Sequence, residues 1–249
     1  MIGIFAALRR ELKPIKAFLT EINEFREAGV WFSVGRLNQR TIVLIQTGIG
    51  WDRTVSAVQI AAARFPLKLY VSTGFAAALQ DTIRVGDLVI GQKVLSLPSL
   101  DRRAFMSDEI LTQSAQSVVK SFPVTALSGS LITVRKIVSH AEEKRAIARE
   151  SQAIALDMET AAVADAAEQR RIPFIAVRAV TDVLDEDLGV DVNLFLTEEG
   201  AIRWLEGIRY FLSHPTALHH LNRLRCQANL AARSLGLFFQ EFLPSLSVN

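Results

Sequence analysis

The feature that most constrains the fold is an alternation of short apolar runs with longer stretches of helical periodicity. Residues 2–7 are apolar throughout, which is typical of a strand covered on both faces. Apolar residues at helical spacing follow at 51–64, and a strand is predicted directly after them at 68–72. Strands that alternate with helices favour an α/β fold, and we predict a three-layer α/β/α sandwich with a central mixed sheet.

The same alternation continues to residue 179. Two β-rich runs, 30–34 and 41–45, flank a short polar segment and predict a hairpin. Further strands are predicted at 87–91, 130–133, 153–156 and 174–179, and further helices at 107–121, 141–149 and 157–170. A helical segment is also expected to begin at residues 10–12, where Pro14 is tolerated only because it lies near the start.

The last part of the chain has a different pattern. From about residue 217 to 242, apolar residues recur at helical spacing beside histidines and arginines, which predicts one or two amphipathic helices. We expect residues 215–249 to form a helical C-terminal extension. Because half of the 249 residues are hydrophobic and no repeat or low-complexity linker divides them, residues 1–249 are predicted to form a single domain.

Composition excludes several classes of function. The formal net charge of +2 gives no reason to expect a nucleic acid partner. A single cysteine, Cys226, cannot form an internal disulfide, and no Cys/His cluster has the spacing of a zinc site, so we expect no metal. No apolar stretch is long enough to span a membrane and the N-terminus does not resemble a signal peptide, so we expect a cytoplasmic protein.

Acidic residues follow three of the predicted strands. Glu11 follows the first strand, Asp157 and Glu159 follow the strand at 153–156, and Asp182 follows the strand at 174–179. Ligands bind at the carboxyl ends of strands in open α/β sheets, although a single acid at such a place more often caps a helix. Several carboxylates at one sheet edge would repel one another and raise at least one pKa, which is more typical of a site than of a scaffold.

Two short segments resemble a known family. Residues 155–162, Ala-Leu-Asp-Met-Glu-Thr-Ala-Ala, resemble its Glu-Met-Glu or Asp-Met-Glu signature, and residues 177–182, Val-Arg-Ala-Val-Thr-Asp, resemble its Arg-Ala-(Ile/Val)-Ser-Asp segment. Residues 3–12 and 47–50 match in order and spacing. Over about its first two hundred residues the chain resembles the methylthioadenosine/S-adenosylhomocysteine nucleosidases and their phosphorylase relatives, in the nucleoside phosphorylase and nucleosidase superfamily.

The resemblance implies an enzyme that cleaves the N-glycosidic bond of a purine nucleoside, preferably adenine-containing. Asp182 would protonate or hydrogen-bond N7 of the purine, Glu159 would hold the ribose hydroxyls, and Glu11 would activate the attacking water. The substrate-binding residues implied are Phe75, Ala77, Val138, Met158 and Glu159. The resemblance also implies a homodimer without a cofactor.

The sequence favours hydrolysis over phosphorolysis. The Gly-Asp-Pro-x-Arg segment of the hexameric phosphorylases is absent, and Phe75 stands where many relatives carry a serine hydroxyl. Phosphorolysis, with phosphate as co-substrate, remains the alternative, and Arg9, Arg10 and Arg53 are the candidates for an anion site. A second alternative is a non-catalytic protein that binds a nucleoside or acts as an interaction scaffold.

Within the superfamily, the Asp-Met-Glu-Thr-Ala segment, residues 185–188 and the basic helical tail resemble the hopanoid-associated phosphorylases. This resemblance implies an adenosylhopane-type lipid as an alternative substrate. An amphipathic helix with flanking arginines can lie on an anionic membrane, so peripheral contact with the inner membrane surface through the C-terminal helices is an alternative to packing on the domain itself.

Overall fold

The computed structural model describes residues 1–97, 103–120, 124–188 and 217–246. The elements are, in chain order, β1 (Ile2–Ala6), α1 (Arg9–Lys16), β2 (Thr20–Glu27), β3 (Val30–Leu37), β4 (Arg40–Gln46), α2 (Trp51–Arg64), β5 (Leu69–Ala78), β6 (Leu88–Ser96), β7 (Ala104–Met106), α3 (Glu109–Val119), β8 (Ala126–Thr133), α4 (Ala141–Ser151), β9 (Ala155–Asp157), α5 (Thr160–Arg170), β10 (Phe174–Asp182) and α7 (Ala217–Ser245).

The strands form one mixed sheet, part of which closes on itself. The path through the sheet is β10-β6-β8-β9-β5-β1-β4-β3-β2, and β10 also pairs with β5. Strands β5, β10, β6, β8 and β9 therefore form a closed circuit. Strands β1, β4, β3 and β2 continue from β5 as an open part of the sheet that ends at β2. Strand β1 runs parallel to both β4 and β5, and β10 runs parallel to β5.

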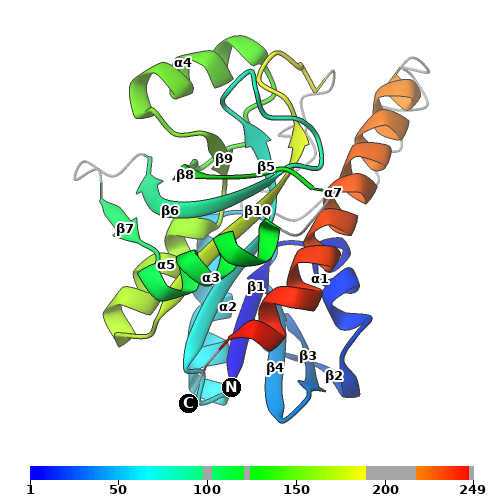
Figure 1. The fold of residues 1–249 in the computed structure, drawn as a ribbon, viewed down its shortest axis with the longest axis vertical. Helices are drawn as coiled ribbons and strands as arrows, with labels where there is room; N and C mark the ends of the chain where they lie inside the picture. Colours follow the sequence, from blue (N-terminus) through cyan, green and yellow to red (C-terminus); the bar gives the residue numbers. More distant parts are fainter. Residues whose placement is uncertain (98–102, 121–123, 189–216, 247–249) are drawn as a thin grey trace.

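Helices cover both faces of the sheet (Figure 1). Helices α2 and α5 contribute Val58, Ala61 and Val163 to one apolar cluster, whose strand residues include Phe5 and Tyr70. Helices α1, α3 and α7 contribute to a second cluster on the opposite face, in which Ile15, Ala115 and Phe239 are all buried. The predicted three-layer α/β/α sandwich with a mixed sheet is confirmed.

The structure differs from the predicted elements mainly at strands that carry few apolar residues. Strand β2 is exposed along most of its length and lies at the edge of the sheet, so its residues show no buried alternation. The three-residue β7 pairs with β6 and was also not predicted. The helix expected at 157–170 begins at Thr160, because Asp157 ends β9 and Glu159 occupies the position before the first helical turn.

Helix α7 packs its apolar stripe against its own domain. Along its length, Ala231, Leu235, Phe238, Phe239 and Phe242 are all buried. The helix contacts β10, α1 and α3. Of the helices in the described ranges, none combines the length and apolar character needed to cross a membrane. Residues 215, 216 and 247–249 of the predicted extension lie outside the described residues.

The buried stripe of α7 predicts a large contribution to stability. Replacing Phe239, which is fully buried, by alanine should lower the free energy of unfolding by about 3–5 kcal/mol, because it leaves a cavity between helix and sheet. Chemical denaturation followed by circular dichroism measures this change. The adjacent Gln240→Ala variant, at an exposed position, is the matched control, and equal effects of the two variants would contradict the packing of α7.

Candidate active site

One cavity of about 220 Å³ collects the residues that the sequence singled out. It lies where the carboxyl ends of β1, β5, β9 and β10 meet. Its lining includes Glu11, Phe75, Ala77, Val138, Met158, Glu159 and Asp182, together with Leu8, Ile49, Asp157 and Leu188. The structure thus brings together all three acids and all the substrate-binding residues expected from the sequence.

Glu11 is held by two backbone N–H groups. Its Oε2 accepts a hydrogen bond from Leu8 N at 2.6 Å, and its Oε1 accepts one from Phe75 N at 2.8 Å. The first bond caps the start of α1, while the second ties the helix to β5. Burial raises the pKa of Glu11, whereas the nearby Arg178 guanidinium and the backbone N–H groups oppose this rise.

Glu159 lies at the start of α5 and bonds to the loop after β4. Its Oε1 accepts a hydrogen bond from Gly50 N at 2.7 Å. Gly50 has a φ of +92°, in the region that favours glycine, so the loop conformation that directs this N–H depends on residue type. Burial raises the pKa of Glu159 to about 7, despite the opposing charge of Arg178.

Asp182 ends β10 and is paired with a lysine that the sequence did not single out. Its Oδ2 lies 2.9 Å from Nζ of Lys144 on α4, and its Oδ1 lies 3.0 Å from the Thr181 hydroxyl. The Lys144 side chain is fully buried and also donates to Val183 O at 2.6 Å. Burial raises the pKa of Asp182, and the Lys144 ammonium limits the rise.

Arg178 is the second buried cation that the sequence analysis missed. It is fully buried on β10, and its Nε lies 2.9 Å from Oδ2 of Asp157. The guanidinium also donates to Thr160 Oγ1, to Ser72 Oγ and to Thr73 O. Because Nε and both terminal nitrogens have partners, Arg178 is fixed in position, and its charge acts on Glu11 and Glu159.

Asp157 connects this cation to the backbone that carries Glu159. Its Oδ1 accepts hydrogen bonds from Glu159 N and Thr160 N, both at 3.2 Å, and from Thr133 Oγ1 at 2.8 Å. Its other oxygen is taken by Arg178 and the Thr160 hydroxyl. Both oxygens of Asp157 are therefore occupied by groups of the protein itself.

Gly74 allows the cation and Glu11 to approach β5. A Cβ atom at this position would lie 2.6 Å from Nη1 of Arg178 and 2.7 Å from Oε1 of Glu11. Its φ of +132° is also one that other residues rarely adopt. Both observations explain a glycine directly before Phe75.

A sequence signal existed for one of the two missed cations. Arg178 interrupts an otherwise apolar strand that is buried throughout its centre. A charge at such a position needs a partner, so Arg178 indicated a buried acid. Lys144 gave no such signal, because the segment around it is strongly charged and its burial is known only from the structure.

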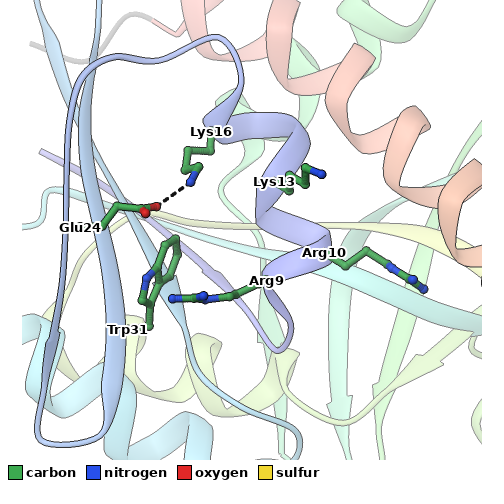
Figure 2. Close-up of a pocket in the computed structure, with 6 residues that line it drawn as sticks. All are labelled: Arg9, Arg10, Lys13, Lys16, Glu24 and Trp31. Atoms are coloured by element: carbon green, nitrogen blue, oxygen red, sulfur yellow. Dashed lines mark hydrogen bonds and ion pairs between the residues drawn. The ribbon is translucent and has the colours of Figure 1, made fainter.

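A second hollow, of about 230 Å³, lies beside α1 and is lined by cations (Figure 2). Arg9 lies over the Trp31 ring at 4.6 Å, and Lys16 forms an ion pair with Glu24 at 2.7 Å. Arg10 points to the other side of the helix (Figure 2).

Among the described residues that line the carboxylate cavity, the only lysine or arginine is Lys136. Arg9 and Arg10 therefore do not converge on the three acids.

The described residues give no sign of a metal centre. In these ranges, no group of three or more His, Cys, Asp or Glu side chains is placed to hold a metal ion. The acids are satisfied instead by backbone N–H groups and by buried cations.

Comparison with known proteins gives the family. The sequence model of the Phosphorylase superfamily matches residues 1–206. The chain belongs to this superfamily. It is 30% identical over 213 residues to the 5′-methylthioadenosine/S-adenosylhomocysteine nucleosidase of Staphylococcus haemolyticus, which covers 80% of this chain and 93% of that protein. The corresponding protein of Staphylococcus saprophyticus is 30% identical over 217 residues, covering 81% and 94%.

Solved structures share the fold of this superfamily member. The nucleosidase of Neisseria meningitidis, solved with methylthio-immucillin-A, superposes with a TM-score of 0.78 at 21% identity and covers 98% of this chain and 99% of its own. Futalosine hydrolase of Helicobacter pylori gives a TM-score of 0.75 at 19% identity, covering 96% and 97%. The predicted resemblance to the nucleosidases is confirmed, and this phosphorylase-superfamily member is an enzyme of the N-glycosidase class.

The buried Glu159 predicts a pH-dependent stability. In the folded enzyme the Glu159 carboxyl keeps its proton up to about pH 7, whereas in the unfolded chain it releases the proton near its ordinary pKa of 4.5. Folding therefore takes up a proton between these values, and the free energy of unfolding falls as pH rises through this window. Glu159→Gln removes the ionisable group, so it should be more stable than the wild type by about 3 kcal/mol above pH 7 and gain nothing below pH 4.5.

Denaturant unfolding at pH 4.5, 6 and 8 measures this difference. Glu150→Gln, at an exposed position on α4, is the matched control. A gain for Glu159→Gln that is the same at every pH would contradict the prediction.

Proposed function

We propose that this enzyme hydrolyses the N-glycosidic bond of an adenine nucleoside, with Glu11, Glu159 and Asp182 as its catalytic carboxylates. The observation that carries the proposal is the convergence of these three buried acids in one cavity, with Arg178 and Lys144 beside them. Cleavage builds positive charge on the ribose and negative charge on the departing base. In the proposed reaction, Glu11 and Glu159 serve the sugar end of that bond and Asp182 serves the base end.

Asp182 is the acid that gives a proton to N7 of the purine. A carboxyl with a raised pKa retains a proton closer to neutral pH, which is what a general acid requires. Val138 and Leu156, both buried, supply apolar surface to the cavity, against which a flat base can lie. Phe75 and Ala77 line the same cavity from β5.

Glu159 holds the ribose hydroxyls, and Met158 packs on the sugar. Hydrogen bonds from the hydroxyls to a carboxylate strengthen as the sugar becomes oxocarbenium-like, so this contact favours the transition state over the ground state. The Met158 side chain lies near Gly50, since a Cβ atom at position 50 would lie 3.8 Å from Met158 Cε. The loop and the methionine therefore form one wall.

Glu11 takes a proton from the attacking water. Its two backbone bonds fix the carboxylate, and burial makes the ionised group more basic than an exposed glutamate. The family resemblance leads one to expect a serine hydroxyl at position 75, where this chain has an apolar ring, yet the Phe75 backbone N–H still reaches Glu11. The placement of this base therefore does not depend on the missing hydroxyl.

Hydrolysis is preferred to phosphorolysis because of what surrounds the acids. A phosphate dianion beside the sugar needs arginines in fork geometry or several hydroxyl donors. Arg9 lines the second hollow and Arg10 points to the other side of α1. Among the described residues, the carboxylate cavity has no arginine in its lining, and its cation is Lys136. The proposed reaction consumes water and requires no cofactor, and phosphate would be a co-substrate only in the alternative.

Three expectations stay predictions: a homodimer, peripheral membrane contact and a lipid-linked adenosine substrate. Leu8, Ile49 and Leu188 give the cavity an apolar part that suits an apolar 5′ substituent, such as an alkylthio group or a lipid chain. Because the apolar stripe of α7 is buried, membrane contact would have to use the cationic side chains of that helix.

The proposed reaction predicts release of free adenine without phosphate. Incubation with adenosine, 5′-methylthioadenosine, S-adenosylhomocysteine and an adenosine with a long 5′ alkyl chain, each with and without phosphate, should yield adenine and the free sugar at rates that phosphate does not change. Chromatography of both products makes the measurement. Strict dependence on phosphate, with a sugar 1-phosphate as product, would replace hydrolysis by phosphorolysis.

The proposed roles predict that each acid is needed. Asp182→Asn and Glu11→Gln should each lower kcat by about 10²–10⁴-fold, because each removes a proton-transfer group. Asp81→Asn, at an exposed turn, serves as the control and should keep the wild-type rate. Full activity of either variant, with its fold intact by circular dichroism, would remove that residue from the mechanism.

A further inference from the structure

Lys144 is fully buried, and its charge faces the carboxylate that the proposed reaction uses as an acid. Its Nζ lies 2.9 Å from Oδ2 of Asp182 and 2.6 Å from the carbonyl oxygen of Val183. The lysine itself does not line the cavity, so it reaches the substrate only through Asp182. A buried ion pair of this kind contributes little to stability compared with apolar packing, which calls for another reason for its presence.

The ammonium differentiates the two oxygens of Asp182. An ammonium only donates hydrogen bonds, so the oxygen that accepts from Lys144 cannot direct a proton toward it. Oδ1 is bound by the Thr181 hydroxyl, which also lies 3.4 Å from Ala76 O and can donate to either acceptor. When the acid is protonated on Oδ1, Thr181 can turn to Ala76 and leave that proton to the base.

We propose that Lys144 is a positioning residue for the acid step: it holds Oδ2 of Asp182, so that the proton passed to the purine is carried on Oδ1, and it balances the carboxylate charge left after transfer. This inference rests on the proposed function. In the step, the Oδ1–H bond breaks and an N–H bond forms on the purine, which takes the electron pair of the C1′–N bond. Water adds its hydroxyl to C1′ and gives its proton to Glu11, and Lys144 keeps its own proton throughout.

The loop after β10 holds this pair in place. Asp187 Oδ1 accepts a hydrogen bond from Ala141 N at 2.6 Å, and Leu188 N donates to Ser139 O at 3.0 Å, so the loop is bound to the start of α4. From α7, Gln227 donates to Glu186 at 2.8 Å. Of the charged groups, Lys144 on α4 lowers the pKa of Asp182 and Glu186 in this loop raises it. Glu11, Asp157, Glu159 and Lys136 line the same cavity, to which β5 contributes the uncharged Phe75, Ala76 and Ala77.

The test is the pH profile of kcat/KM for Lys144→Met, with the nucleoside that the wild type cleaves fastest. At high pH, kcat/KM should fall when Asp182 loses its proton, and this fall is the alkaline limb of the profile. Without the ammonium the pKa of Asp182 rises, so the alkaline limb should shift to a pH about one unit or more higher. The maximum should fall by about 10–100-fold, because the carboxylate formed on proton transfer is no longer balanced. Lys144→Arg keeps the positive charge, so its alkaline limb should lie at the same pH as that of the wild type.

Arg145→Met is the matched control. Arg145 is the next residue on α4, is exposed, and pairs with Asp185 rather than with the acid, so its loss should change neither the rate nor the limb. A Lys144→Met enzyme within about twofold of the wild type, or one whose rate falls while the limb stays in place, would overturn the proposal. If the wild type released no purine at all, the proposed function itself would fail instead.

A double-mutant comparison keeps the proposal testable if Lys144→Met does not fold, since removing both charges avoids an unpaired buried acid. If the lysine acts through Asp182, adding Lys144→Met to Asp182→Asn should change the residual rate less than about twofold. A further tenfold loss in the double variant would assign Lys144 a separate role and contradict the proposal.

Discussion

Arg178 supplies the positive charge around which the carboxylates of the site are arranged. Its guanidinium binds Asp157 directly and lowers the cost of burying Glu11 and Glu159. Glu11 follows β1, whereas Asp157 and Glu159 belong to one segment after the start of β9, so their approach requires β1, β5, β9 and β10 to meet at one sheet edge. Without a buried cation, the desolvation and mutual repulsion of the acids would oppose that approach.

The two buried cations act on different ends of the scissile bond in the proposed reaction. Arg178 lies beneath the acids assigned to the water and the ribose, whereas Lys144 is paired with the acid assigned to the base. The environment therefore gives carboxylates that are chemically alike different partners, although burial raises the pKa of all three. Such a difference in environment is the usual way in which one site performs both acid and base chemistry near neutral pH.

Much of this arrangement could be predicted from residues that lie close together in the sequence. The Asp-Met-Glu segment and the end of β10 identified Glu159 and Asp182, because both follow strands whose apolar pattern is strong. Edge strand β2 could not be found in this way, since its exposed residues carry no buried alternation. Lys144 escaped for a related reason: a lysine in a charged helix looks solvated until tertiary packing brings Asp182 against it.

Position 75 illustrates how the scaffold divides work between backbone and side chain. The peptide N–H of Phe75 holds Glu11, whatever side chain the residue carries, and Gly74 before it provides the space for that contact. The side chain at position 75 can therefore vary without moving Glu11, which the proposed reaction uses as its base. A substitution of Phe75 would alter the lining of the cavity and leave in place the backbone hydrogen bond that fixes Glu11.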